Sequence, residues 1–128
     1  MMKKDSSKIN TFKDLIVWQE GHKLVLLIYK STKQFPRDEQ FGLVSQMRRS
    51  AVSITSNIAE GFIRRSYKDK LNFFTISKGS LIELENQLLI SKDVTYLDLA
   101  DYNVINEQIK KVRMLLSAFI TKTKSLIT

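Results

Sequence analysis

The segment YNVINEQIKKVRMLLSAF, residues 102–119, decides the fold, because its apolar side chains recur at alternating steps of three and four residues. That spacing places them on one face of an α-helix, which can pack into a helical bundle. The helix is expected to begin near Asp98. Its predicted core face consists of Tyr102, Ile105, Ile109, Val112, Leu116 and Phe119.

A second helix is predicted directly before it, from about Ser66 to Ser91. The Ser66 side chain can cap the first backbone amides, and Asp69 can reach back to the cap. Gly79 lies in the middle of this helix, where glycine costs about 1 kcal/mol relative to alanine. A close helix crossing at Gly79 is therefore expected. The predicted core face is Leu71, Phe74, Ser77, Leu81, Leu84 and Leu88.

A third helix is predicted from Asp38, as its N-cap, to about Ile63. Residues 50–57 are poor in helix formers and alternate as a strand would. The helical spacing continues on both sides of them, however, and no partner strand is available, so the whole segment is predicted to be helical. Its core face is Phe41, Val44, Met47, Ala51, Ile54, Ile58 and Phe62.

The first helix is predicted over residues 14–34, with Thr11 as N-cap, Asp14 completing the cap, and Phe35-Pro36 ending it. Its predicted inward face is Leu15, Trp18, His22, Val25, Tyr29 and Thr32. Leu24, Leu27 and Ile28 form a second apolar edge, which is more than the core of one chain requires and which predicts a contact with another chain.

The connections at residues 35–38, 64–66 and 92–97 are short, so consecutive helices are expected to pack antiparallel. The sequence thus predicts an all-α protein, an up-down-up-down four-helix bundle formed by a single domain over residues 1–128. Residues 1–12 are predicted to be a flexible basic arm.

The composition indicates a soluble protein of the cytoplasm. The chain has no cysteine, which is compatible with a reducing compartment, and its basic N-terminus is not followed by the apolar stretch of a signal peptide. No apolar run is long enough to span a membrane. The formal net charge is +8, spread over all segments of the chain.

Polar residues recur every three or four positions on one side of the predicted helix 38–63. Such a face can form a buried hydrogen-bonded network between helices, or it can present donors to phosphate or carboxylate groups. The sequence leaves both interpretations open. The residues are Gln46, Arg49, Ser53, Asn57, Glu60 and Arg64, with Arg48 beside them.

Catalysis and metal binding are not expected. His22 is the only histidine and is predicted to be a core or interface residue, and Glu83 and Glu85 point to different sides of their helix. No nucleophile elbow or glycine-rich phosphate loop is found. The sequence therefore predicts a protein that is not an enzyme, without a cofactor or metal.

Basic residues occur in three clusters, and a pI near 9.8 fits nucleic-acid binding through phosphate contacts. In a symmetric oligomer, the charge of each cluster would be multiplied around the axis. RNA is slightly favoured over DNA. The clusters are Arg48-Arg49, Arg64-Arg65 with Lys68 and Lys70, and Lys110-Lys111 with Arg113.

Three segments, FKDLIVWQEGHKLVLLIYKSTKQFP, FGLVSQMRRSAVSITSNIAEGFIRRS and FFTISKGSLIELENQLL, resemble the bacterial four-helix-bundle family first noticed as proteins encoded by intervening sequences of 23S rRNA genes. The resemblance covers residues 12 to about 97. It implies a homopentamer, similar to an accessory protein of diversity-generating retroelements that binds nucleic acid and a reverse transcriptase. The family signature falls on Arg48, Arg49, Ser53, Asn57, Glu60, Gly61, Arg64 and Ser66.

Two functional hypotheses follow, and a third, enzymatic one would need a second acid or a metal ligand to converge on Glu60 or Glu83 in space. The first is an oligomeric module that binds RNA or DNA through clustered Arg and Lys, without reading bases. The second is a protein-interaction scaffold, for a partner such as a reverse transcriptase. In the second hypothesis the polar face of helix 38–63 is internal, with Arg48 and Glu60 buried against each other, and the apolar edge of the first helix docks the partner.

Overall fold

Four long α-helices follow one another in the computed structural model, which describes residues 8–128, and none of these residues forms a strand. The all-α prediction is confirmed. Short 3-10 turns precede the first two helices. In chain order the elements are η2 (Phe12–Asp14), α1 (Ile16–Thr32), η3 (Arg37–Glu39), α2 (Leu43–Ile63), α3 (Tyr67–Asp93) and α4 (Leu99–Ser125).

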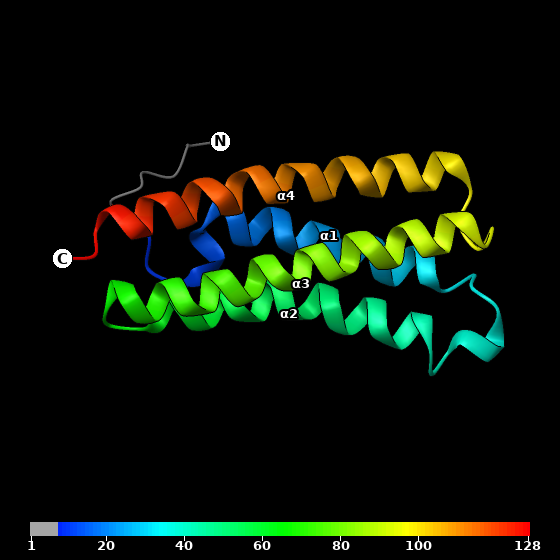
Figure 1. The fold of residues 1–128 in the computed structure, drawn as a ribbon, viewed down its shortest axis with the longest axis horizontal. Coiled ribbons are helices and arrows are strands. Elements are labelled where there is room, and N and C mark those ends of the chain that lie inside the picture. The colour runs from blue at the N-terminus through cyan, green and yellow to red at the C-terminus, as the bar shows by residue number, and fades with distance from the viewer. Residues whose placement is uncertain (1–7) are drawn as a thin grey trace.

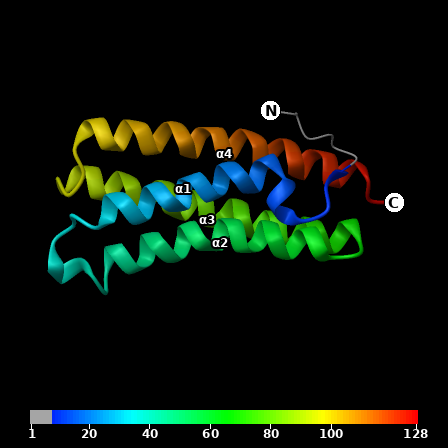
Figure 2. The same cartoon turned by 180° about the vertical axis from the view of Figure 1, so that it is seen from behind.

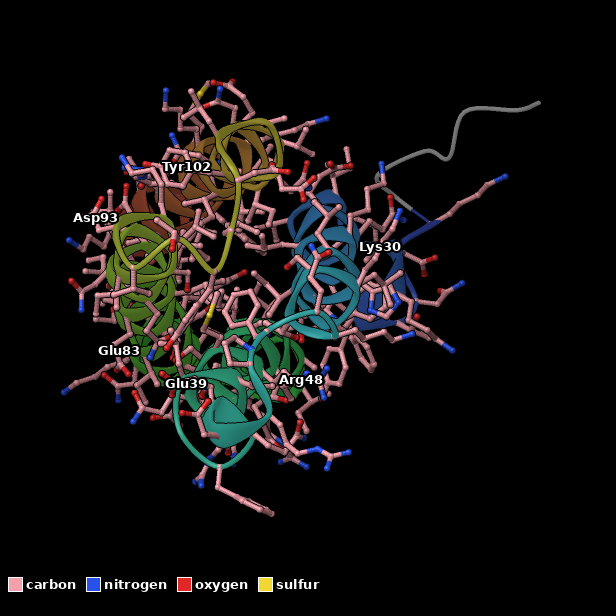
Figure 3. The ribbon with its side chains drawn as sticks, turned by 90° about the vertical axis from the view of Figure 1, so that its right-hand side faces the viewer. Lys30, Glu39, Arg48, Glu83, Asp93 and Tyr102 are labelled. Carbon is pink, nitrogen blue, oxygen red and sulfur yellow. The ribbon has the colours of Figure 1, made fainter. Side chains whose placement is uncertain are left out.

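The four helices lie side by side along the long axis of the molecule (Figure 1). The connections from α1 to α2 and from α3 to α4 lie at one end of the bundle. The α2–α3 turn and the C-terminus lie at the other, and the view from behind agrees (Figure 2). A view along the long axis shows the helices surrounding a central space filled with side chains (Figure 3).

The core faces predicted for α3 and α4 are confirmed, apart from three half-buried residues at their edges. The buried residues of the α4 face are Ile105, Ile109, Val112 and Leu116. The half-buried residues are Tyr102 and Phe119 on α4 and Leu71 on α3. Each fully buried aliphatic side chain contributes roughly 2 kcal/mol relative to an exposed one. On α3, the buried residues of the predicted face are Phe74, Ser77, Leu81, Leu84 and Leu88.

Two of the predicted caps, at Thr11 and Ser66, are present, and Asp98 adds a third that was predicted only as the start of its helix. The Ser66 hydroxyl accepts a hydrogen bond from the Asp69 backbone amide at 3.1 Å, and Asp98 caps α4 in the same way. Thr11 and Asp14 form the expected capping box, but it begins the 3-10 turn η2, and α1 starts only at Ile16. Side chains therefore satisfy backbone donors at the start of α3, α4 and η2.

The predicted cap at Asp38 is wrong. Residues 37–39 form η3, and α2 begins at Leu43, whose backbone amide donates to the Glu39 carboxylate at 3.1 Å. Glu39 thus takes the role expected of Asp38. Because Phe41 precedes the helix, it does not share the inward face assigned to it and is 96% exposed.

The predicted inward face of the first helix is only partly right. Leu15, Val25 and Thr32 are buried, but His22 and Tyr29 are exposed and Trp18 is half-buried. Leu24 and Ile28, assigned to an edge for another chain, are fully buried in the core of this one. The backbone of α1 lies close to α2 at Gly21, where an added Cβ would lie 3.1 Å from Thr55 Cγ2, so the helix turns this side inward.

The close crossing expected at Gly79 is also wrong. Gly79 is exposed, and an added Cβ there would meet no atom within 4 Å. The tight approach of α2 and α3 lies at Gly61 instead, against the ring of Phe74. Glycine at 61 therefore has a packing reason that glycine at 79 lacks.

Part of the predicted basic arm is packed. Ile9 contacts the core, and the Asn10 backbone amide donates to the Asp14 carboxylate at 2.9 Å. Residues 1–7 of the predicted arm lie outside the described part of the chain.

Candidate nucleic-acid interface

Arg48 binds the C-terminal end of α1. Its Nε donates to Thr32 Oγ1 at 3.0 Å and its Nη2 donates to the Tyr29 carbonyl at 3.4 Å. The guanidinium lies 4.7 Å from the centre of the Tyr29 ring. Figure 3 shows Arg48 on the side of α2 that faces α1. The side chain therefore satisfies a terminal helix carbonyl and joins two helices, so its structural role is direct.

Arg48→Met is expected to lower the free energy of unfolding by about 1–2 kcal/mol, because it removes charged hydrogen bonds to partly buried acceptors while keeping the aliphatic stem. Urea denaturation followed by circular dichroism measures this loss. Arg49→Met is the matched control and should change stability by less than about 0.5 kcal/mol. Equal effects of the two substitutions would contradict the assigned role.

Ser53 and Asn57 form hydrogen bonds within the bundle. The hydroxyls of Ser53 and Ser80 share a hydrogen bond of 2.7 Å that joins α2 to α3. Asn57 Nδ2 donates to the Ser53 carbonyl at 2.8 Å and to its hydroxyl at 3.1 Å. Ser77 extends the contact by donating to the Ile54 carbonyl at 2.8 Å. This part of the polar face is a network between helices.

Glu60 pairs with Arg64 on its own helix at 2.9 Å, and the Arg64 guanidinium lies 4.5 Å from the centre of the Phe73 ring. Arg48 lies twelve residues before Glu60 on α2, about 18 Å along the axis, so the two do not meet. The buried Arg48–Glu60 contact that the scaffold hypothesis expected is absent from the described residues.

Lys70 closes the C-terminal end of α2. Its Nζ donates to the carbonyls of Phe62 at 2.6 Å and Gly61 at 3.3 Å. Burial lowers the pKa of Lys70 below its ordinary value, since the neutral form loses less hydration. Lys70 therefore stabilises the fold, although the sequence placed it in a basic cluster.

The predicted cluster on α4 is largely neutralised. Lys110 lies 3.5 Å from Glu107, Lys111 lies 3.2 Å from Glu20, and the Arg113 guanidinium lies 3.0 Å from Glu85 on α3. These acidic partners reduce the attraction that the cluster can exert on phosphate. The three residues are thus poorer candidates than the sequence indicated.

Three predicted cations are free. Arg49, Arg65 and Lys68 are exposed, and their side chains form no hydrogen bond or ion pair with any residue of the described range. Arg49 lines an open depression on α1 and α2 together with Arg48, Tyr29, Phe41 and Val52. Of the predicted binding residues, these three have no side-chain hydrogen bond or ion pair to another described residue that would compete with a partner.

Glu20 is a buried carboxylate that the sequence analysis did not identify. It accepts from Lys23 Nζ at 2.9 Å and from Gln108 Nε2 at 3.1 Å, and it pairs with Lys111. The hydrogen bonds from Lys23, Gln108 and Lys111 outweigh burial and lower the pKa of Glu20 to about 2. Glu20 lies on the same buried stripe of α1 as Val17 and Leu24. The sequence analysis assigned a different stripe as the inward face and therefore missed it.

His22 is exposed and stacks on Trp18, with ring centres 4.8 Å apart and planes 13° from parallel. Of the two positions predicted for it, the core is therefore wrong, and an interface with another chain stays a prediction. Phe12 meets the edge of Trp18 at 5.2 Å. Within residues 8–128, no three His, Asp or Glu side chains gather closely enough to hold a metal ion. In the same range, no helix combines the length and the apolarity that crossing a membrane requires.

Comparison with known proteins identifies relatives in sequence and in fold. Residues 13–118 match the family described as 23S rRNA-intervening sequence protein. A crystal structure of a protein of unknown function from the S23 ribosomal protein family of Bacteroides thetaiotaomicron VPI-5482 has a similar fold, with a TM-score of 0.77 at 24% identity. That match covers 83% of this chain and 96% of the other. No curated protein matches the sequence significantly.

Proposed function

Because the chain belongs to the 23S rRNA-intervening sequence protein family, we propose that this up-down-up-down bundle is a non-enzymatic, oligomeric module of the cytoplasm that binds nucleic acid, with RNA favoured. The observation that carries the proposal is the set of exposed, unpaired cations Arg49, Arg65 and Lys68 on a chain of net charge +8. The family description, which refers to an rRNA, supports RNA over DNA.

The proposed mechanism is electrostatic. Lys and Arg displace the counterions condensed on nucleic-acid phosphates, which gives affinity without reading the sequence. The internal contacts of Arg48, Ser53 and Asn57 assign the α2 network to the fold, so it leaves few groups to contact base edges. Binding is therefore expected to depend on charge and shape.

An electrophoretic titration tests the proposal directly. The chain should shift a structured RNA at about 50 mM salt, and binding should weaken by orders of magnitude near 200 mM. Arg65→Ala should weaken binding to unrelated RNAs by similar factors, since it removes a phosphate contact. Absence of any shift at low salt would reject the proposed function.

The proposed assembly is a homopentamer, in which each free cation occurs five times around one axis. Light scattering should then give a solution mass of about 75 kDa for a chain of 14.9 kDa. A mass near that of one chain would show that assembly does not multiply the charge. A single bundle would then have to bind RNA by itself.

The scaffold hypothesis retains one specific observation in its favour. Phe41 is 96% exposed beside the depression lined by Tyr29, Val44 and Val52, and a bare aromatic ring of this kind is common in protein interfaces. A protein partner such as a reverse transcriptase would be captured in a salt-insensitive way. Loss of that capture in Phe41→Ser, with RNA binding unchanged, would favour the scaffold role.

A further inference from the structure

The two ends of the bundle differ in charge. One end consists of residues 8–14, 60–71 and 117–128, and we call it the basic end; Figures 1 and 2 both place the α2–α3 turn and the end of α4 there. It contains eight Lys or Arg against three Asp or Glu. The opposite end, residues 30–42 and 89–103, contains four against five. The net charges are therefore +5 and −1.

Internal contacts do not cancel this excess. At the basic end, only Lys70 and Arg64 are occupied, by backbone carbonyls of α2 and by Glu60. The Asp14 carboxylate accepts hydrogen bonds from backbone amides. The remaining cations are exposed, and their side chains have no hydrogen bond or ion pair within the described residues. They are Lys8, Lys13, Arg65, Lys68, Lys122 and Lys124.

We propose that the basic end is the surface that contacts nucleic-acid phosphates, so that the RNA meets the bundle end-on at the α2–α3 turn and the end of α4. This inference rests on the proposed function and assigns it a place. It adds Lys122 and Lys124, which sequence analysis did not name. It also excludes the α4 cluster Lys110, Lys111 and Arg113, because its charges are paired with carboxylates.

Physical reasoning favours a polyanion as the partner of this surface. Unpaired cations close together on one end raise the local positive potential, and each one can replace a condensed counterion on a phosphate chain. The opposite end carries exposed cations as well, but its acidic residues outnumber its basic ones. Phosphates approaching the molecule are therefore drawn to one end.

Two triple variants with the same net charge test the assignment. Lys68→Gln, Lys122→Gln and Lys124→Gln remove three free cations from the basic end. Lys30→Gln, Lys33→Gln and Arg37→Gln remove three exposed cations without side-chain partners from the opposite end. Thermal unfolding should be nearly unchanged in both variants, because the substituted side chains are exposed and unpaired.

Fluorescence anisotropy with a structured RNA gives the expected difference. At about 100 mM salt, the basic-end variant should bind about tenfold more weakly or worse, and the slope of log K against log salt should fall by about 2 to 3. The opposite-end variant should lose less than about threefold.

Each other result overturns the assignment. Equal weakening of both variants would mean that only net charge matters. A wild-type chain that does not bind RNA would reject the proposed function, and the assignment with it. If the chain binds phosphatidylserine vesicles through Lys68, Lys122 and Lys124 and does not bind RNA, the partner of the basic end would be an anionic membrane instead.

Discussion

Gly61→Ala is expected to destabilise the protein by about 2 kcal/mol. An added Cβ would lie 2.5 Å from Phe74 Cε1, 2.9 Å from Phe74 Cδ1 and 3.1 Å from Phe73 Cβ. Phe74 is 1% exposed and its ring stacks on Phe119 at 4.7 Å, so it cannot move aside cheaply. Overpacking of this kind costs about 3 kcal/mol, which exceeds the gain of about 1 kcal/mol from replacing glycine within a helix.

Gly79→Ala is the matched control, since Gly79 lies inside α3 with open space at its Cβ. It should stabilise the protein by up to about 1 kcal/mol, through helix propensity alone. Urea denaturation of both variants measures the free energy of unfolding, which should fall in Gly61→Ala and rise in Gly79→Ala. A neutral or stabilising Gly61→Ala would show that α2 and α3 do not meet closely at this position.

Glu20→Gln is expected to lower the free energy of unfolding by up to about 3 kcal/mol at neutral pH. The Glu20 pKa is about 2 in the folded chain, against an ordinary value of 4.5. A lowered pKa contributes stability that is complete above pH 4.5 and is lost as the pH falls from 4.5 towards 2. Glutamine keeps the side-chain shape and removes the charge that Lys23 and Lys111 contact.

The pH dependence separates this effect from simple packing damage. The stability difference between wild type and Glu20→Gln should shrink as the pH is lowered from 5 to 2 and should vanish near the acid limit, because protonation removes the same charge. Glu107→Gln is the control, since its pair with Lys110 is exposed and contributes less than about 0.5 kcal/mol. A difference that stays constant with pH would contradict the assigned role of Glu20.

Helix number and approximate limits were predictable because apolar residues recur at steps of three and four within each helix, and on α3 and α4 those steps lead to side chains that are mostly buried. The first helix was different. Its apolar residues cover more than one stripe, so spacing alone does not determine its inward face. The face that turns inward is the one on which Gly21 lies close to Thr55 of α2. Glu20 was missed and His22 was assigned to the wrong face for the same reason, because both assignments depend on how α1 is rotated about its axis.

The candidate site was predictable in composition but not in detail. Arg48 and Arg49 are adjacent in sequence, yet only Arg48 faces α1 and binds its last turn. Lys111 and Arg113 meet carboxylates on α1 and α3, a pairing that depends on how the helices pack. Sequence clustering therefore finds cations, whereas the fold determines which of them remain free for a partner.

The most direct measurement for the electrostatic account is the dissociation constant for two RNAs of equal length and unrelated sequence, measured from about 50 to 200 mM salt. The account predicts steep log–log slopes that are the same for both RNAs, since counterion release supplies the affinity. Affinity that is independent of salt, or that strongly prefers one of the two RNAs at every salt concentration, would contradict it.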